Sequence, residues 1–186
     1  MTPSTALLHR IENTPALATA LVCPGDFDIT RRDPVDELHL PGGLPLHPIA
    51  GCDTGGTYYL CGAGGADQRP VLHTDSEGRA TLIGADLIEA ITLVVVLPFW
   101  RDVLRGFPQA DLKSELLEFH PDFETERDHL LHALNLPALP EREAATRLLT
   151  TATRTSPAYV PYAQDDADRH PYDLYFDPAR ERPGCQ

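Results

Sequence analysis

The sequence is short of basic residues, and this shortage excludes several functions. Its 186 residues contain 15 arginines and lysines against 28 aspartates and glutamates, which gives a formal net charge of −13. A surface this acidic repels phosphate groups, so we expect no binding to nucleic acid or to an anionic membrane surface. Lys113 is the sole lysine and lies in a predicted helix, which excludes a phosphate-binding Gly-Lys-Ser/Thr loop.

Long apolar runs are also missing. The longest, residues 91–100, has half the length of about 20 residues that a membrane-spanning helix requires. The N-terminal residues 1–8 lack the basic start of a secretory signal peptide, and no small-residue cleavage site follows them. We therefore expect a cytoplasmic protein.

Cysteine is scarce and its spacing carries no metal or redox motif. The chain has four cysteines, and no two of them form a Cys-x-x-Cys pair, which excludes a zinc ribbon and a thioredoxin-type site. In a reducing cytoplasm we expect free, buried thiols. A Cys52–Cys61 disulfide stays open as an alternative, because the two residues flank a predicted strand. The four cysteines are Cys23, Cys52, Cys61 and Cys185.

Catalytic motifs are absent as well. There is no Gly-x-Ser-x-Gly nucleophile elbow, and the glycine-rich residues 62–66 precede a predicted strand instead of the helix that a dinucleotide fingerprint requires. Glu126, His129 and His132 are spaced to share one face of a helix, but carboxylate-bridged di-iron bundles need two Glu-x-x-His copies and this chain has one. We expect no catalytic residue, no metal and no cofactor.

Apolar periodicity predicts an α+β fold with a mainly antiparallel, twisted sheet flanked by helices. The segment 23–48 is predicted as a loop with one strand at 27–30. Predicted strands with short connections, which form an antiparallel meander, cover 57–61, 69–74 and 78–83. Predicted helices cover 4–12, 16–22, 86–97, 99–104, 111–119, 122–134 and 140–152. We expect one domain over 1–160, followed by an acidic tail over 161–186 with an edge strand at 172–176 and a frayed end.

Seven positions carry local structural signals. Asp86 is a predicted helix cap, and Glu89 completes a capping box three residues later. After Asp53, Gly55 or Gly56 is expected at a positive φ in a tight turn. In the turn at 75–78, Gly78 is expected in the left-handed conformation. Trp100 is predicted to be a core anchor.

The glycine turn and its surroundings resemble a known family. The run Ile49-Ala50-Gly51-Cys52-Asp53-Thr54-Gly55-Gly56-Thr57-Tyr58-Tyr59 is followed by Pro70-Val71-Leu72, Ser76-Glu77-Gly78, Ile83-Gly84-Ala85-Asp86-Leu87 and Leu97-Pro98-Phe99-Trp100. This order is similar to the SUKH superfamily, which includes fungal cell-wall-assembly regulators and bacterial immunity proteins. The likeness is clearest over 48–104, roughly a third of the chain. It implies a capped helix packed on an antiparallel sheet, and a protein that neutralises toxins by binding them, without family-wide catalytic residues.

The charge and the resemblance together predict a non-enzymatic immunity protein that binds a basic, nuclease-like toxin of a bacterial polymorphic toxin system. Predicted partner contacts are the acids of the irregular loop and two tyrosine anchors: Asp26, Asp28, Asp33, Asp36, Glu37, Tyr58 and Tyr162. A regulatory or scaffolding protein-binding module is the alternative. A third hypothesis is a metal-dependent enzyme built on Glu126, His129 and His132.

Overall fold

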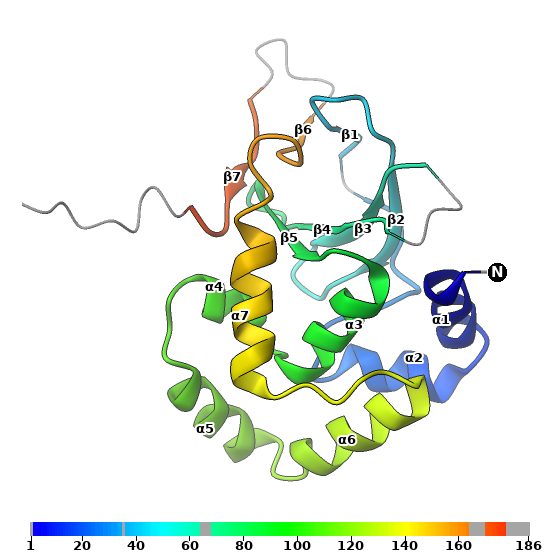
Figure 1. The fold of residues 1–186 in the computed structure, drawn as a ribbon, viewed down its shortest axis with the longest axis vertical. Helices are drawn as coiled ribbons and strands as arrows, with labels where there is room; N and C mark the ends of the chain where they lie inside the picture. The colour runs from blue at the N-terminus through cyan, green and yellow to red at the C-terminus, as the bar shows by residue number, and fades with distance from the viewer. Residues whose placement is uncertain (1, 35, 64–67, 164–169, 178–186) are drawn as a thin grey trace, which may run out of the picture.

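The computed structural model describes residues 2–34, 36–63, 68–163 and 170–177 (Figure 1). The described helices are α1 (Pro3–Glu12), α2 (Pro15–Val22), α3 (Leu87–Val96), α4 (Trp100–Leu104), α5 (Gln109–Phe119), α6 (Phe123–Leu134) and α7 (Glu141–Ala152). The described strands are β1 (Leu38–His39), β2 (Leu46–Gly51), β3 (Thr57–Cys61), β4 (Val71–Thr74), β5 (Arg79–Gly84), β6 (Tyr162–Ala163) and β7 (Asp173–Leu174). The predicted α+β class is confirmed.

The main sheet has the order β2-β3-β4-β5-β7. Neighbouring strands from β2 to β5 are antiparallel, with Thr57 opposite Thr74 and Tyr58 opposite His73, so the predicted meander is confirmed. At the far edge β7 runs parallel to β5. A second sheet consists of the two short antiparallel strands β1 and β6.

Three strands (β1, β2 and β6) were missed and one was misplaced. β2 begins inside the segment 23–48 that was predicted as a loop, where Pro48 argues against a strand. The sheet accepts this proline because β2 is an edge strand whose register shifts between Pro48 and Ala50. The strand predicted at 27–30 is wrong, because that segment makes only an isolated bridge between Asp28 and Gly51.

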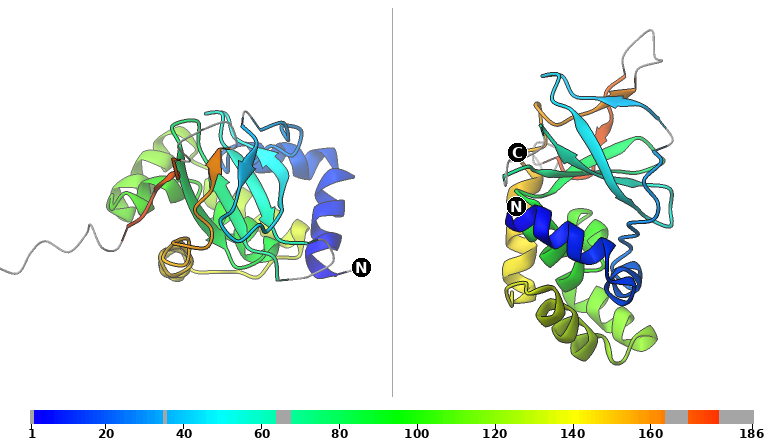
Figure 2. Two further views of the ribbon diagram at one scale, coloured as in Figure 1. Left: turned by 90° about the horizontal axis from the view of Figure 1, so that it is seen from above. Right: turned by 90° about the vertical axis from the view of Figure 1, so that its right-hand side faces the viewer.

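Helices cover one face of the main sheet. The second view of Figure 2 shows the sheet at one end of the molecule and most of the helices at the other. Trp100 is 1% exposed in the core between them, as predicted. The predicted capping box also forms: Asp86 Oδ1 accepts a hydrogen bond from the Glu89 N–H at 2.8 Å, and the Glu89 carboxylate accepts one from the Ala85 N–H at 2.7 Å.

The opposite face, called the outer face here, is covered by the β1–β6 ribbon. It has its own apolar cluster, which includes Leu40, Tyr59, Leu72 and Leu82. The segment after residue 160 adds the two strands β6 and β7, and Tyr175 reaches the main core. The end of the predicted tail, residues 178–186, lies outside the described residues. Over the described ranges, no helix combines the length and apolar character needed to cross a membrane.

Candidate functional site

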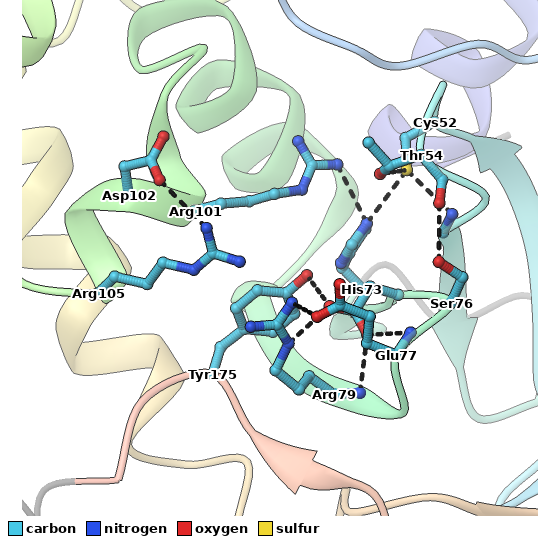
Figure 3. A network of polar contacts seen from close by, with 12 residues as sticks. Cys52, Thr54, His73, Ser76, Glu77, Arg79, Arg101, Asp102, Arg105 and Tyr175 are labelled. Atoms are coloured by element: carbon cyan, nitrogen blue, oxygen red, sulfur yellow. Dashed lines mark hydrogen bonds and ion pairs between the residues drawn. The ribbon is translucent and has the colours of Figure 1, made fainter.

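A polar network lies buried beneath the turns at one end of the sheet (Figure 3). At its centre is Arg101 of α4, whose Nη1 lies 3.2 Å from Asp26 Oδ2. Arg101 Nη2 donates to Tyr58 Oη at 3.3 Å and lies 3.2 Å from His73 Nε2. The guanidinium also stacks over the Trp100 ring at 4.6 Å. Arg101 therefore ties α4 to β3, to β4 and to the loop after α2.

Cys52 extends this network into the glycine turn. Its Sγ lies 3.8 Å from His73 Nε2 and accepts a hydrogen bond from the Gly56 N–H at 3.1 Å. A Cβ on Gly56 would lie 2.5 Å from the Thr74 carbonyl oxygen and 2.8 Å from Cys52 Sγ, so only glycine fits. Gly55 has a φ of 84°, which confirms the predicted positive φ in this turn.

Burial determines which groups of the network are charged and which are neutral. Burial, with a contribution from Arg101, holds the pKa of His73 well below its ordinary value, so its imidazole is neutral. Because Arg101 cannot accept a hydrogen bond, His73 Nε2 is the acceptor and the proton lies on Nδ1, which has no partner among the described residues. Burial raises the pKa of Tyr58, so its hydroxyl stays protonated and donates to the Asp26 carbonyl oxygen at 3.1 Å. Since His73 and Tyr58 are neutral, the charged groups around Arg101 are the Arg101 guanidinium itself and the Asp26 carboxylate, which form an ion pair.

A second ion pair fixes the turn between β4 and β5. Asp75 Oδ2 accepts hydrogen bonds from Tyr175 Oη at 2.6 Å and from Arg79 Nε at 2.8 Å, while its Oδ1 accepts from the backbone of Glu77 and Arg79. Burial opposes ionisation of Asp75, but these hydrogen bonds outweigh it and hold the pKa of the carboxyl below its ordinary value. Gly78 completes the turn with a φ of 78°, as predicted.

The two turns meet and close one end of a small hollow on the outer face. Ser76 Oγ donates to the Thr54 carbonyl oxygen at 2.9 Å and so joins the turn at 52–56 to the turn at 75–78. The hollow has a volume of about 60 Å³. Its lining is rich in hydroxyl groups and consists of Asp36, Leu38, Gly55, Thr57, Tyr59, Thr74, Asp75, Ser76 and Tyr172.

A larger hollow of about 280 Å³ lies beside it, along β1 and the start of β2. Both hollows are lined by Asp36, Leu38 and Tyr59. We call the two together the Asp36 groove. The rest of the larger hollow is Pro34, Glu37, His39, Leu40, Gly43, Leu44, Pro45, Leu46 and Pro48.

Asp36 is exposed at the junction of the two hollows. Its Oδ2 accepts a hydrogen bond from Tyr172 Oη at 3.3 Å. Burial, together with the nearby Asp36 carboxylate, raises the pKa of Tyr172 to about 12, so this phenol stays protonated. Asp36 takes part in none of the ion pairs between described residues. It therefore presents a negative charge to solvent inside a recess.

The predicted partner residues do not form one surface. Asp36 and Glu37 line the Asp36 groove, with the Glu37 carboxylate 3.9 Å from His39 Nε2. Tyr162 lies half-buried in β6, where its ring is 5.8 Å from that of His39. Asp28 binds within its own turn, since its Oδ1 accepts hydrogen bonds from the Thr30 N–H and hydroxyl. Asp33 is exposed.

Tyr58 and Asp26 do not suit the predicted contact role. Tyr58 is 0% exposed, because alternation along β3 turns its ring into the helix-side core, so it offers no surface anchor. Asp26 is held by Arg101, and its Oδ1 accepts a hydrogen bond from the Asp53 N–H at 2.7 Å. Both residues are structural parts of the buried network. Asp53 itself forms an exposed ion pair with Arg31 at 3.1 Å.

The three cysteines that the structure describes are free thiols, as predicted. Cys52 and Cys61 are buried and unpaired, whereas Cys23 is exposed, contrary to the expectation of burial. Burial raises the pKa of Cys61 to about 12, so its thiol is protonated at neutral pH. Cys185 lies outside the described residues.

The α6 residues do not assemble a metal site. Glu126, His129 and His132 are exposed, and nowhere in the described part of the chain do three potential ligand side chains gather around a common point. Glu126 and His129 instead line a groove of about 610 Å³ between α2 and α6, with apolar side chains such as Phe123 and Leu130.

Sequence reasoning missed the residues at the centre of the buried network. Arg101 directly follows the predicted core anchor Trp100, and His73 lies in a short strand whose other residues are buried. A polar residue at the inward position of such a strand is the available signal for a buried polar contact. The sequence does not name its partners, because Arg101 and Asp26 are distant along the chain.

Comparisons with protein-family models, with curated proteins and with solved structures gave no match. Two features of the described residues bear on function: a buried network that fixes two turns, and an acidic groove that those turns help to shape.

Proposed function

We propose that the protein is a non-enzymatic immunity protein, which binds and neutralises a basic, nuclease-like toxin of a bacterial polymorphic toxin system in the cytoplasm. The observation that carries the proposal is the Asp36 groove. It is a recess on the outer face in which two carboxylates, Asp36 and Glu37, lie beside aromatic and apolar side chains. The net charge of −13 has the sign that attracts such a partner.

The groove combines the two features that protein interfaces use. Exposed carboxylates attract a basic partner over long range and speed association at low salt. The 43% exposed Leu44 offers apolar surface that a partner side chain can cover. Because the neighbouring turns are held by partly buried ion pairs, the recess is formed before binding, which reduces the ordering cost of association.

Burial of the most reactive side chains supports a binding role. A cysteine beside a histidine suits covalent catalysis only where a substrate can reach the thiol. Cys52 and His73 are both 0% exposed in this structure. Their contacts with Gly56 and Arg101 stabilise the turn and the sheet, and we assign them that structural role.

The proposal is tested by co-expression with the toxin candidate encoded next to this gene. Wild-type protein should restore growth, and the double variant Asp36→Asn/Glu37→Gln should not. The matched control Glu115→Gln/Glu118→Gln removes the same charge from exposed positions of α5, at the other end of the molecule from β1 (Figure 1), and should rescue like the wild type.

Purified proteins give the kinetic counterpart. We expect the association rate of the complex to fall steeply as salt rises, and to fall at low salt in the groove variant more than in the α5 control. Growth that stays inhibited despite tight binding would overturn neutralisation and favour the scaffolding alternative. Equal behaviour of both double variants would remove the groove from the interface.

A further inference from the structure

We infer that the small hollow of the Asp36 groove is a subsite for the ammonium end of one lysine side chain of the partner. This inference rests on the proposed function and specifies the chemistry of the contact. The hollow's volume is about 60 Å³, against about 280 Å³ for the larger hollow beside it. The tip of one side chain therefore fits it better than a base, a sugar or a stretch of backbone.

The hydrogen-bonding state of the lining favours a ligand that only donates. A hydroxyl group has one proton to donate and two lone pairs that accept. The Ser76 hydroxyl already donates its hydrogen bond to the Thr54 carbonyl oxygen, and the Tyr172 hydroxyl donates to the Asp36 carboxylate. Both hydroxyl oxygens can still accept a hydrogen bond from a ligand. The Asp36 carboxylate also only accepts, and its negative charge attracts a cationic donor and repels a carboxylate or a phosphate.

The floor of the hollow is buried and polar. Thr57 and Thr74 face each other across β3 and β4 and are 6% and 4% exposed. Their hydroxyls lie within hydrogen-bonding reach of the Tyr59 phenol. Burial raises the pKa of Tyr59, and these two contacts offset part of that rise. Each hydroxyl oxygen has two lone pairs, so it can also accept a hydrogen bond from a bound ammonium group.

Lysine fits better than arginine or a metal ion. An ammonium group is a compact charge with three donors that point in different directions, which suits acceptors placed around a small cavity. A guanidinium is a planar fork that pairs best with both oxygens of one carboxylate, and Tyr172 already occupies one Asp36 oxygen. Calcium requires six to eight oxygen ligands, and the described residues hold no group of three potential metal-binding side chains.

The test titrates short capped peptides into the isotope-labelled full-length protein and follows amide signals by NMR. The peptides are identical except for a central lysine, arginine or Nε-acetyllysine. We expect the lysine peptide to shift the signals of Gly55, Thr57, Thr74 and Ser76, with a dissociation constant of roughly millimolar order. The acetyllysine peptide, which lacks the charge, should leave these signals unchanged, and the arginine peptide should bind about fivefold more weakly.

Variants separate the subsite from general charge attraction. Asp36→Asn should weaken lysine-peptide binding about tenfold, the value of one lost charge-assisted hydrogen bond. Asp33→Asn, an exposed acid of the same loop, should change it less than about twofold. Thr74→Val should weaken binding and Thr74→Ser, which restores the hydroxyl, should recover it.

Each outcome bears on one proposal at a time. Equal binding of the lysine and acetyllysine peptides, shifts confined to other residues, or arginine binding as tight as lysine would overturn the lysine subsite. If the toxin is neutralised while the lysine peptide fails to bind the hollow, the subsite is wrong and the proposed function stands. If the peptide binds as described but no toxin is neutralised, the subsite stands and the proposed function is wrong.

Discussion

Replacing Gly56 by alanine is a sharp test of how closely the glycine turn packs on the buried network. The added Cβ would lie 2.5 Å from the Thr74 carbonyl oxygen, 2.8 Å from Cys52 Sγ and 2.8 Å from His73 Nε2. Favourable contacts between nonbonded carbon atoms lie at about 3.5–4.0 Å, so the methyl group is roughly 0.7–1 Å too close to three atoms at once. One of them is backbone of β4, which pairs with strands on both sides and cannot move alone.

Overpacking of a well-filled core costs about 1–3 kcal/mol, and the backbone clash places Gly56→Ala near the upper end, at about 3 kcal/mol. For a chain of this size each kcal/mol lowers the melting temperature by about 2–4 °C, so we expect a decrease of about 6–12 °C. Gly42→Ala is the matched control, because a Cβ on Gly42 meets no atom within 4 Å. It should change the free energy of unfolding by less than about 0.5 kcal/mol.

Denaturant unfolding followed by circular dichroism, with thermal melts alongside, measures both variants against the wild type. If Gly56→Ala unfolds within about 0.5 kcal/mol of Gly42→Ala, the turn does not pack against Thr74 and His73 as described. The buried network would then not support the outer hollow.

Two further predictions concern the same network. Arg101→Met should lower the free energy of unfolding by about 2–4 kcal/mol, because it leaves the partly buried Asp26 carboxylate without its counterion. The control Arg105→Met breaks a more exposed ion pair with Asp102 and should lower the free energy of unfolding by less than about 1 kcal/mol. Equal losses in the two variants would contradict the difference in burial between the two pairs. His73 is neutral when folded and takes up a proton below a pKa of about 6.5 when unfolded, so stability should be complete above that pH and fall below it by up to about 1.4 kcal/mol per pH unit. Unfolding curves at pH 7, 6 and 5 should show this slope reduced in His73→Leu and retained in the exposed control His132→Gln; a slope that His73→Leu leaves unchanged would assign the effect to other groups.

The parts of the fold that follow from local chemistry were predictable from the sequence. The Asp86–Glu89 capping box depends on residues three apart, and a helix begins there with the expected hydrogen bonds. The positive φ of Gly78 likewise follows from a four-residue turn between two β-rich segments. In these cases the interactions that fix the conformation lie within a few residues of one another.

Strands that depend on distant partners were not predictable in this way. β2 contains Pro48, and its pairing with β3 outweighs the local signal of a loop. β1 and β6 are two residues each, and they form only because Leu38 lies opposite Ala163 in the folded chain. A two-residue strand has no periodicity to detect, so its existence is a property of the tertiary structure.

The candidate site shows the same division. An acidic loop was predicted to face a partner, and Asp36 and Glu37 do line a groove. Asp26 comes from the same loop, yet Arg101 holds it inside the network. Composition cannot distinguish the two cases, because both are aspartates in an irregular acidic segment. The difference arises from which carboxylate meets a guanidinium after the chain folds.

Strand alternation links the buried network to the groove. In β3, Tyr58 points to the helix-side core while Thr57 and Tyr59 line the Asp36 groove, and in β4 His73 points inward while Thr74 lines the hollow. Neighbouring residues of the same two strands thus support the fold on one face and shape the recess on the other. Substitutions on the inward face should therefore lower stability before they affect binding. Substitutions at exposed Asp36 should do the reverse, which separates the two roles in a single set of variants.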